Sequence, residues 1–140
     1  MMTMIAGVAE AHITISPNQS MAGATEKYVL RVPTESKVAT VAAELEVPEG
    51  VIVEAIAMPG AKYEAKRNAD NRIVSIVWTL NVPPSEFVEL AFIARNPRDK
   101  AEIVWTIRQR FADGTVSDWT KGPNGVRPTS MTKLAPRPAQ

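Results

Sequence analysis

The sequence has no cysteine and only one histidine, His12. The lack of cysteine excludes disulfides, thiolate zinc sites and iron–sulfur clusters, because each of these needs cysteine sulfur. A single imidazole also excludes a metal site that draws on several histidines of this chain. A Ser-His-Asp triad could use only His12. The chemistry that the sequence can offer therefore centres on this one residue.

An excess of charge and long apolar runs are lacking as well. Sixteen Lys and Arg residues oppose fifteen Asp and Glu residues, and the net charge of +1 argues against a strongly basic nucleic-acid binder. No apolar run approaches the roughly 18 residues of a membrane-spanning helix. The glycines form neither of the two phosphate-binding patterns, G-x-x-x-x-G-K-[ST] and G-x-G-x-x-G. With 140 residues, 45% of them hydrophobic, the chain has the size and composition of one globular domain.

Alternation of apolar and polar residues predicts β-strands along most of the chain. In residues 41–47 and 103–108, for example, every second residue is apolar, which places one face on a core and the other in water. Turn signals separate such segments, and Asp113-Gly114 is typical of a hairpin. The predicted strands are residues 12–16, 26–33, 38–47, 51–58, 62–66, 73–80, 86–95, 101–111 and 115–120. No helix is expected, so the fold class is all-β, an antiparallel sandwich or barrel of about 7–9 strands.

The two ends of the chain differ from this pattern. Residues 1–11 are small and apolar and finish with Ala9-Glu10-Ala11, the A-x-A pattern that precedes secretory cleavage. The segment lacks a basic start, so it is interpreted as the remnant of a secretion leader, with a loose N-terminus or an extra edge strand as alternatives. Residues 121–140 are rich in proline and are predicted to form an extended tail. The predicted domain is residues 12–120.

His12 is the candidate metal ligand. Cleavage after Ala11 would leave His12 with a free α-amine, and this amine and Nδ1 could chelate one ion. Two nitrogens with a carboxylate and water suit tetragonal Cu(II). If strand 12–16 runs antiparallel to strand 26–33, Glu35 is the acid nearest His12 and Glu26 lies at the far end. The alternative is an ordinary surface or capping histidine at the start of a strand.

Other candidate side chains have simpler interpretations. All three tryptophans, Trp78, Trp105 and Trp119, are predicted to be core aromatics. Trp119 falls where the regular pattern stops, so it could lie at one end of the sandwich. Glu44 and Glu46 share a strand face about 7 Å apart, a spacing that acid–base catalysis could use. A solvated strand face is the preferred interpretation for this pair.

A series of short blocks in this order resembles the YcnI-like domain family over residues 11–120. The blocks are AHITISP (11–17), AGATEKY (22–28), RVPTE (31–35), LEVPEGV (45–51), PG with KYE (59–60 and 62–64), VWT (77–79), QRFADGTV (109–116) and DWT (118–120). The family often has Trp after the Pro-Gly step, where this chain has Ala61. The resemblance implies a bacterial domain with an immunoglobulin-like β-sandwich.

The resemblance also implies a copper site. It assigns His12 as the mature N-terminal ligand, Glu35 as the carboxylate with Glu26 in reserve, and Trp119 beside the metal. Cu(II) is then expected only after cleavage exposes the His12 amine, because an amide nitrogen is a poorer ligand. The implied role is copper trafficking or homeostasis without catalysis, in the periplasm or outside the cell, with a membrane tether beyond Gln140 as an option. Small copper chaperones and CopD-like membrane proteins are the implied partners.

Two further interpretations compete with copper trafficking. A metal-free sandwich could act as an interaction or adhesion module through its exposed strand edges, and substitution of His12 would then leave its function unchanged. A copper enzyme similar to the histidine-brace oxygenases is disfavoured, because those enzymes use a second histidine and this chain has none.

Overall fold

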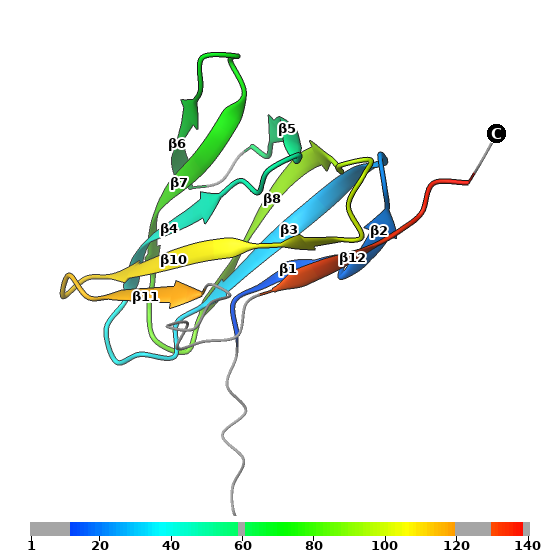
Figure 1. Ribbon diagram of the computed structural model, residues 1–140. Helices are drawn as coiled ribbons and strands as arrows, with labels where there is room; N and C mark the ends of the chain where they lie inside the picture. Colours follow the sequence, from blue (N-terminus) through cyan, green and yellow to red (C-terminus); the bar gives the residue numbers. More distant parts are fainter. Residues whose placement is uncertain (1–11, 59–60, 120–129, 139–140) are drawn as a thin grey trace, which may run out of the picture.

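The computed structural model describes residues 12–58, 61–119 and 130–138, and these residues fold into strands (Figure 1). The predicted leader, residues 1–11, lies outside this described part. Within it there is no helix that could cross a membrane. The strands are β1 (Thr14–Ser16), β2 (Gln19–Met21), β3 (Thr25–Pro33), β4 (Thr40–Glu46), β5 (Ile52–Ile56), β6 (Lys62–Arg67), β7 (Ile73–Val82), β8 (Phe87–Arg95), β9 (Glu102–Val104), β10 (Thr106–Phe111), β11 (Val116–Trp119) and β12 (Met131–Ala135).

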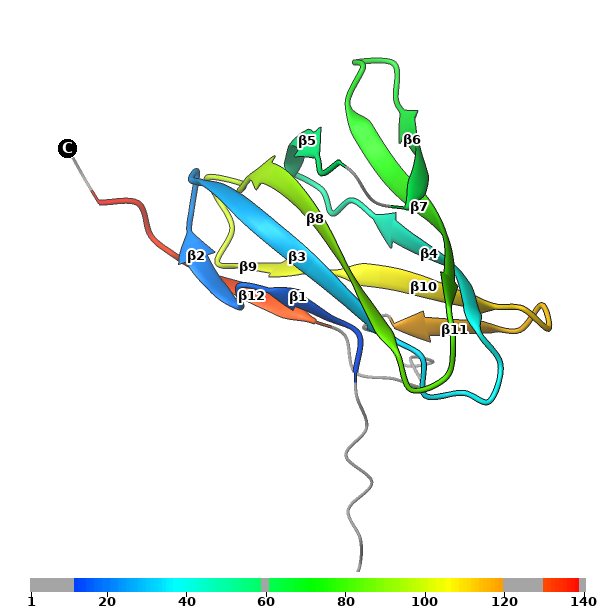
Figure 2. The ribbon, with the colours of Figure 1, turned by 180° about the vertical axis from the view of Figure 1, so that it is seen from behind.

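The strands form two main sheets and a small third one. The four-stranded sheet has the order β1-β3-β8-β5, and the five-stranded sheet has the order β11-β10-β4-β7-β6. The third sheet, β2-β12-β9, lies at the side where β1 and β12 run close together (Figure 2). Within the two main sheets every printed pairing is antiparallel, as the alternating pattern predicts. The prediction of an all-β sandwich is confirmed.

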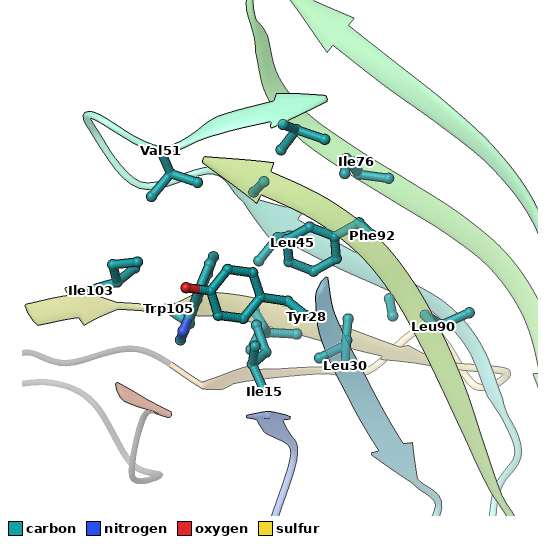
Figure 3. Close-up of a cluster of buried hydrophobic side chains, with 14 of the residues drawn as sticks. Ile15, Tyr28, Leu30, Leu45, Val51, Ile76, Leu90, Phe92, Ile103 and Trp105 are labelled. Carbon is teal, nitrogen blue, oxygen red and sulfur yellow. The ribbon is translucent and has the colours of Figure 1, made fainter. Parts of the chain in front are cut away.

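The core lies between the two main sheets. Alternating residues of each strand point into it, and the residues between them face the solvent. In β3, Tyr28 and Leu30 are buried while Lys27 and Arg31 are exposed. Figure 3 shows Tyr28 beside Phe92 and Trp105, and its ring centroid lies 5.7 Å and 5.0 Å from theirs. The three tryptophans are all buried, as predicted. Fully burying side chains of this size contributes about 1.5–3 kcal/mol each relative to leaving them exposed.

Loop chemistry agrees with the predicted turns. Asp113 and Gly114 connect β10 to β11, and Gly114 has a positive φ of 87° that favours glycine. On the exposed face of the same sheet, Arg108 forms ion pairs with Glu46 at 3.4 Å and with Asp118 at 3.3 Å. Glu46 therefore lies on a solvated face, as predicted, whereas Glu44 is half-buried and accepts a hydrogen bond from Ser75.

The prediction of an extended tail over 121–140 is wrong for residues 131–135. Residues 131–135 form β12, which pairs in parallel with β2 and antiparallel with β9. Thr132 and Leu134 are buried, so their side chains belong to the folded domain. Prolines flank a short alternation of apolar and polar residues in this segment, and they obscure it as a strand signal. The described domain thus continues past residue 120 to β12, while residues 120–129 lie outside the described residues.

Two smaller differences also concern strands. The short strand β2 was not predicted, because its sequence Gln19-Ser20-Met21 has no apolar repeat. The predicted strand 101–111 is divided at Trp105 into β9 and β10, which belong to different sheets. The count of twelve strands among the described residues therefore exceeds the expected range.

Candidate metal site

His12 and Trp119 meet at one end of the sandwich. His12 lies two residues before β1, an edge strand of the four-stranded sheet, and Trp119 is the last residue of β11, an edge strand of the five-stranded sheet. Their ring centroids are 5.7 Å apart and their planes form an angle of 73°, which is an edge-to-face contact. Trp119 is only 3% exposed. The fold therefore brings together two side chains that are far apart in the sequence.

The Nδ1 atom of His12 is buried and has no hydrogen-bond partner among the described residues. A buried polar atom left without a partner costs about 1–3 kcal/mol, so such atoms in folded proteins usually mark a missing water, ion or ligand. Nδ1 is also the imidazole nitrogen closest along the bonds to the α-amine of the same residue. A neutral imidazole nitrogen of this kind can ligate a metal ion. The observed position thus fits a metal ligand, and Trp119 provides an apolar wall beside it.

The strand that follows His12 is held from two sides. β1 pairs with β3, with Thr14 opposite Arg31 and Ser16 opposite Val29. On its other side, the Ile15 amide donates a hydrogen bond of 2.9 Å to the hydroxyl of Ser130. Backbone pairing and this side-chain contact hold residues 14–16, and the buried Ile13 connects them to His12.

The C-terminal strand supplies a second anchor for this region. The Thr132 hydroxyl donates to the Pro17 carbonyl at 2.8 Å and accepts from Nε1 of Trp105 at 3.0 Å. Thr132 is fully buried. Sequence reasoning missed Ser130 and Thr132 because it treated this segment as a tail. The alternation of Thr132 and Leu134 was the signal that could have found them.

The two candidate carboxylates lie at opposite ends of β3. Continuing the β1–β3 register by two residues places residue 12 opposite Pro33, and Glu35 follows Pro33 in the next loop. Glu35 is exposed. Glu26 is seven residues from Pro33 along the strand, or about 23 Å at the usual rise. It accepts a hydrogen bond from Ser20 at 2.8 Å. Glu35 therefore shares its end of the sandwich with His12, and Glu26 does not.

No group of three or more His, Cys, Asp or Glu side chains is placed to hold a metal in residues 12–58, 61–119 and 130–138. What these residues provide near His12 is one imidazole, one indole and the loop that carries Glu35. The assignment of Glu35 and Trp119 to a metal site stays a prediction.

Comparisons with known proteins place the chain among relatives of similar fold. A family model described as a domain of unknown function, DUF1775, matches residues 12–139. The chain is 29% identical over 130 residues to the protein named copper-binding protein CutI of Bacillus subtilis strain 168. That match covers 90% of this chain and 63% of the relative, so the chain spans less than two thirds of the curated relative's length.

Solved structures of other proteins have a similar fold. A Nocardia farcinica protein, described as uncharacterized and as having an immunoglobulin-like fold, superposes with a TM-score of 0.71 and 27% identity. The superposition covers 89% of this chain and 98% of that one. A cohesin module of a Clostridium perfringens family 33 glycoside hydrolase shares the fold alone, with a TM-score of 0.54, 14% identity and coverage of 89% and 98%. The prediction of an immunoglobulin-like sandwich is confirmed.

Proposed function

Since this chain belongs to the DUF1775 family of YcnI-like domains, we propose that it is a copper-binding protein whose metal is held at His12. The observation that carries the proposal is the buried Nδ1 atom of His12, which has no hydrogen-bond partner among the described residues and lies beside Trp119. The identity of 29% to a protein named copper-binding supports the choice of metal.

The proposed ligands are the α-amine and Nδ1 of His12 and the carboxylate of Glu35. Cleavage after Ala11 supplies the amine, so copper binding belongs to the mature protein. Nitrogen and oxygen ligands of this type suit Cu(II) in a tetragonal arrangement. Because the amine and the imidazole must both be deprotonated to bind, affinity falls as the pH falls. The indole of Trp119 limits the access of water to the ion, which strengthens the electrostatic contribution of the ligands.

We assign the protein a role in carrying or buffering Cu(II), without catalysis, in the periplasm or outside the cell. The proposed partners are small copper chaperones and CopD-like membrane proteins, which would deliver or accept the ion. A ligand set drawn largely from one residue leaves positions open for an incoming ligand of a partner protein. Exchange of copper between proteins needs such positions.

A metal-free interaction module is the second candidate function, and one surface favours it. A hollow of about 540 Å³ between the end of β5 and the start of β6 is lined by Met58, Tyr63 and Thr79, among others. Met58 is 85% exposed and Tyr63 is 41% exposed. Exposed apolar side chains around a hollow are typical of protein contact sites.

A competitive Cu(II) titration tests the proposal on two forms of the protein. One form begins at His12 with a free amine, and the other comprises residues 1–140. We expect tight one-to-one binding in the first form, a large loss in the second, and weaker binding when Glu35→Gln is introduced into the first.

Glu26→Gln is the matched control, because it removes the same charge at the far end of β3 and should leave the affinity unchanged. Equal weak binding in both forms would remove the copper site and leave the interaction module as the function.

A further inference from the structure

Three buried polar side chains gather beneath the loop that carries Glu35. Thr34, Thr40 and Gln109 are 1%, 0% and 3% exposed, and they make up half of the buried polar residues in the described part of the chain. Burying a polar group is costly unless it is hydrogen-bonded. These three side chains lie at the same end of the sandwich as His12, so their hydrogen bonds can hold the main chain in place near the candidate metal site.

Gln109 joins the two main sheets at this end. Its side-chain Nε2 donates hydrogen bonds to the Pro33 carbonyl at 2.9 Å and to the Thr40 hydroxyl at 2.8 Å, which uses both hydrogens of the amide. Gln109 belongs to β10, and two residues earlier Ile107 pairs with Trp119 of β11. Pro33 ends β3 opposite residue 12 in the continued register. Gln109 thus links the sheet that carries Trp119 to the strand end beside His12.

The hydroxyl groups of Thr40 and Thr34 extend these hydrogen bonds from Gln109 to Val82. The Thr34 hydroxyl donates to the Val82 carbonyl at 2.9 Å. Because a hydroxyl has a single hydrogen, the bond between Thr34 and Thr40 must be donated by Thr40. Thr40 in turn accepts from Gln109. The chain of donors therefore runs from Gln109 through Thr40 and Thr34 to Val82, with every hydrogen on it used.

Thr34 is fixed through its backbone as well. Its amide donates to the Glu86 carbonyl at 2.9 Å, and its carbonyl accepts from the Ser85 amide at 3.0 Å. Glu35 is the next residue. Three hydrogen bonds to one segment, the end of β7 and the turn that follows it (residues 82–86), therefore define where the main chain of Glu35 begins, although the Glu35 side chain itself is exposed.

We propose that Gln109, Thr40 and Thr34 are positioning residues of the metal site, which hold the start of the Glu35 loop and Pro33 in place against His12 and Trp119. The inference rests on the proposed function. Apolar side chains could fill the same space, but they would not fix the loop in one place, whereas a fully satisfied polar network does. Groups that orient metal ligands in this way commonly change metal affinity by 10–100-fold when they are removed.

The test uses the form that begins at His12 and compares Gln109→Met and Thr40→Val with Thr40→Ser. Gln109→Met removes the amide donor and Thr40→Val removes the hydroxyl donor, each with little change of side-chain volume. Thr40→Ser keeps the hydroxyl. We expect the first two to weaken Cu(II) binding by roughly 10-fold or more and to change the copper hyperfine splitting. Thr40→Ser should restore both to the unsubstituted values.

Tyr28→Phe is the matched control, because it removes a buried hydroxyl that is bonded to Asn96, away from this end of β3. It should leave the copper parameters unchanged. A second readout needs no metal: amide hydrogen exchange at Glu35 and Ser36 should be faster in Gln109→Met and Thr40→Val than in Tyr28→Phe. If Gln109→Met does not fold, the pair Thr40→Val and Thr40→Ser gives the same comparison.

The experiment distinguishes a failure of the proposed function from a failure of this inference. If the unsubstituted protein does not bind Cu(II), the proposed function is wrong and this inference falls with it. If it binds, but Gln109→Met and Thr40→Val match Tyr28→Phe in affinity, hyperfine splitting and hydrogen exchange, the inference alone is overturned.

Discussion

Substitution of Thr132 by Val should destabilise the whole domain, because Thr132 joins the C-terminal strand to Pro17, the residue after β1, and to Trp105 in the core. Its hydroxyl is fully buried and bridges Nε1 of Trp105, at 3.0 Å, to the carbonyl of Pro17, at 2.8 Å. Valine has nearly the same volume, so packing is conserved and the hydrogen bonds alone are lost.

The magnitude follows from the two groups that lose their partner. The buried indole N–H would lose the Thr132 hydroxyl as its acceptor, at a cost of about 1–3 kcal/mol, and the carbonyl of the half-buried Pro17 would lose a donor at a smaller cost. We therefore expect the free energy of unfolding to fall by about 2–3 kcal/mol. That is a large part of the 5–15 kcal/mol typical of a domain.

Urea denaturation followed by tryptophan fluorescence measures this change. Thr132→Ser keeps the hydroxyl and should cost less than about 1 kcal/mol, while Lys133→Ala changes the neighbouring exposed residue and should cost less than about 0.5 kcal/mol. A loss below about 0.5 kcal/mol in Thr132→Val would refute the view that β12 is an integral strand of the domain.

Two further predictions concern backbone conformation and pH. Gly50 and Gly114 both have a φ of 87°, but a Cβ at Gly50 would lie 2.9 Å from the Cβ of Pro97 whereas one at Gly114 meets nothing within 4 Å. Gly114→Ala should therefore cost only the backbone strain of about 1–2 kcal/mol, and Gly50→Ala should cost more, as urea denaturation would reveal; equal losses would contradict the packing argument. Burial raises the pKa of Tyr28 from 10.0 to about 12, so the stability that its neutral form contributes is fully present below pH 10 and is lost as the pH rises through 12. Denaturation at several pH values should show this loss in the unsubstituted protein and a flatter profile in Tyr28→Phe, and parallel profiles would disprove it.

Most of the fold could be predicted because alternation is a local signal. Strands such as β3, with Tyr28, Leu30 and Val32 on one face, repeat it over enough residues to be recognised. The strands β2 and β12 are short, and β12 lies in a segment rich in proline, so the same signal was too weak there. The division of the predicted strand at Trp105 also escaped prediction, because both halves continue the same pattern while they pair with different sheets.

The candidate site could be predicted only in part. The Ala-x-Ala pattern singled out His12, and the antiparallel order of two strands put Glu35 at its end of the sandwich. The contact between His12 and Trp119 could not follow from local pattern, since it depends on how the edges of two sheets meet. Gln109 was overlooked as a functional candidate, although alternation with Ile107 placed a polar residue on the buried face. A polar residue at a core position of a strand was the signal that could have identified it.

Electron paramagnetic resonance of Cu(II) on the form that begins at His12, prepared with and without ¹⁵N-labelled histidine, tests the central claim most directly. Because His12 is the only histidine, the label enters one residue that would supply both the α-amine and Nδ1 as ligands. We predict that labelling changes two strong nitrogen couplings, and that the chain of residues 1–140 lacks the amine coupling. Identical spectra with and without the label, or one spectrum shared by the two forms of the protein, would contradict it.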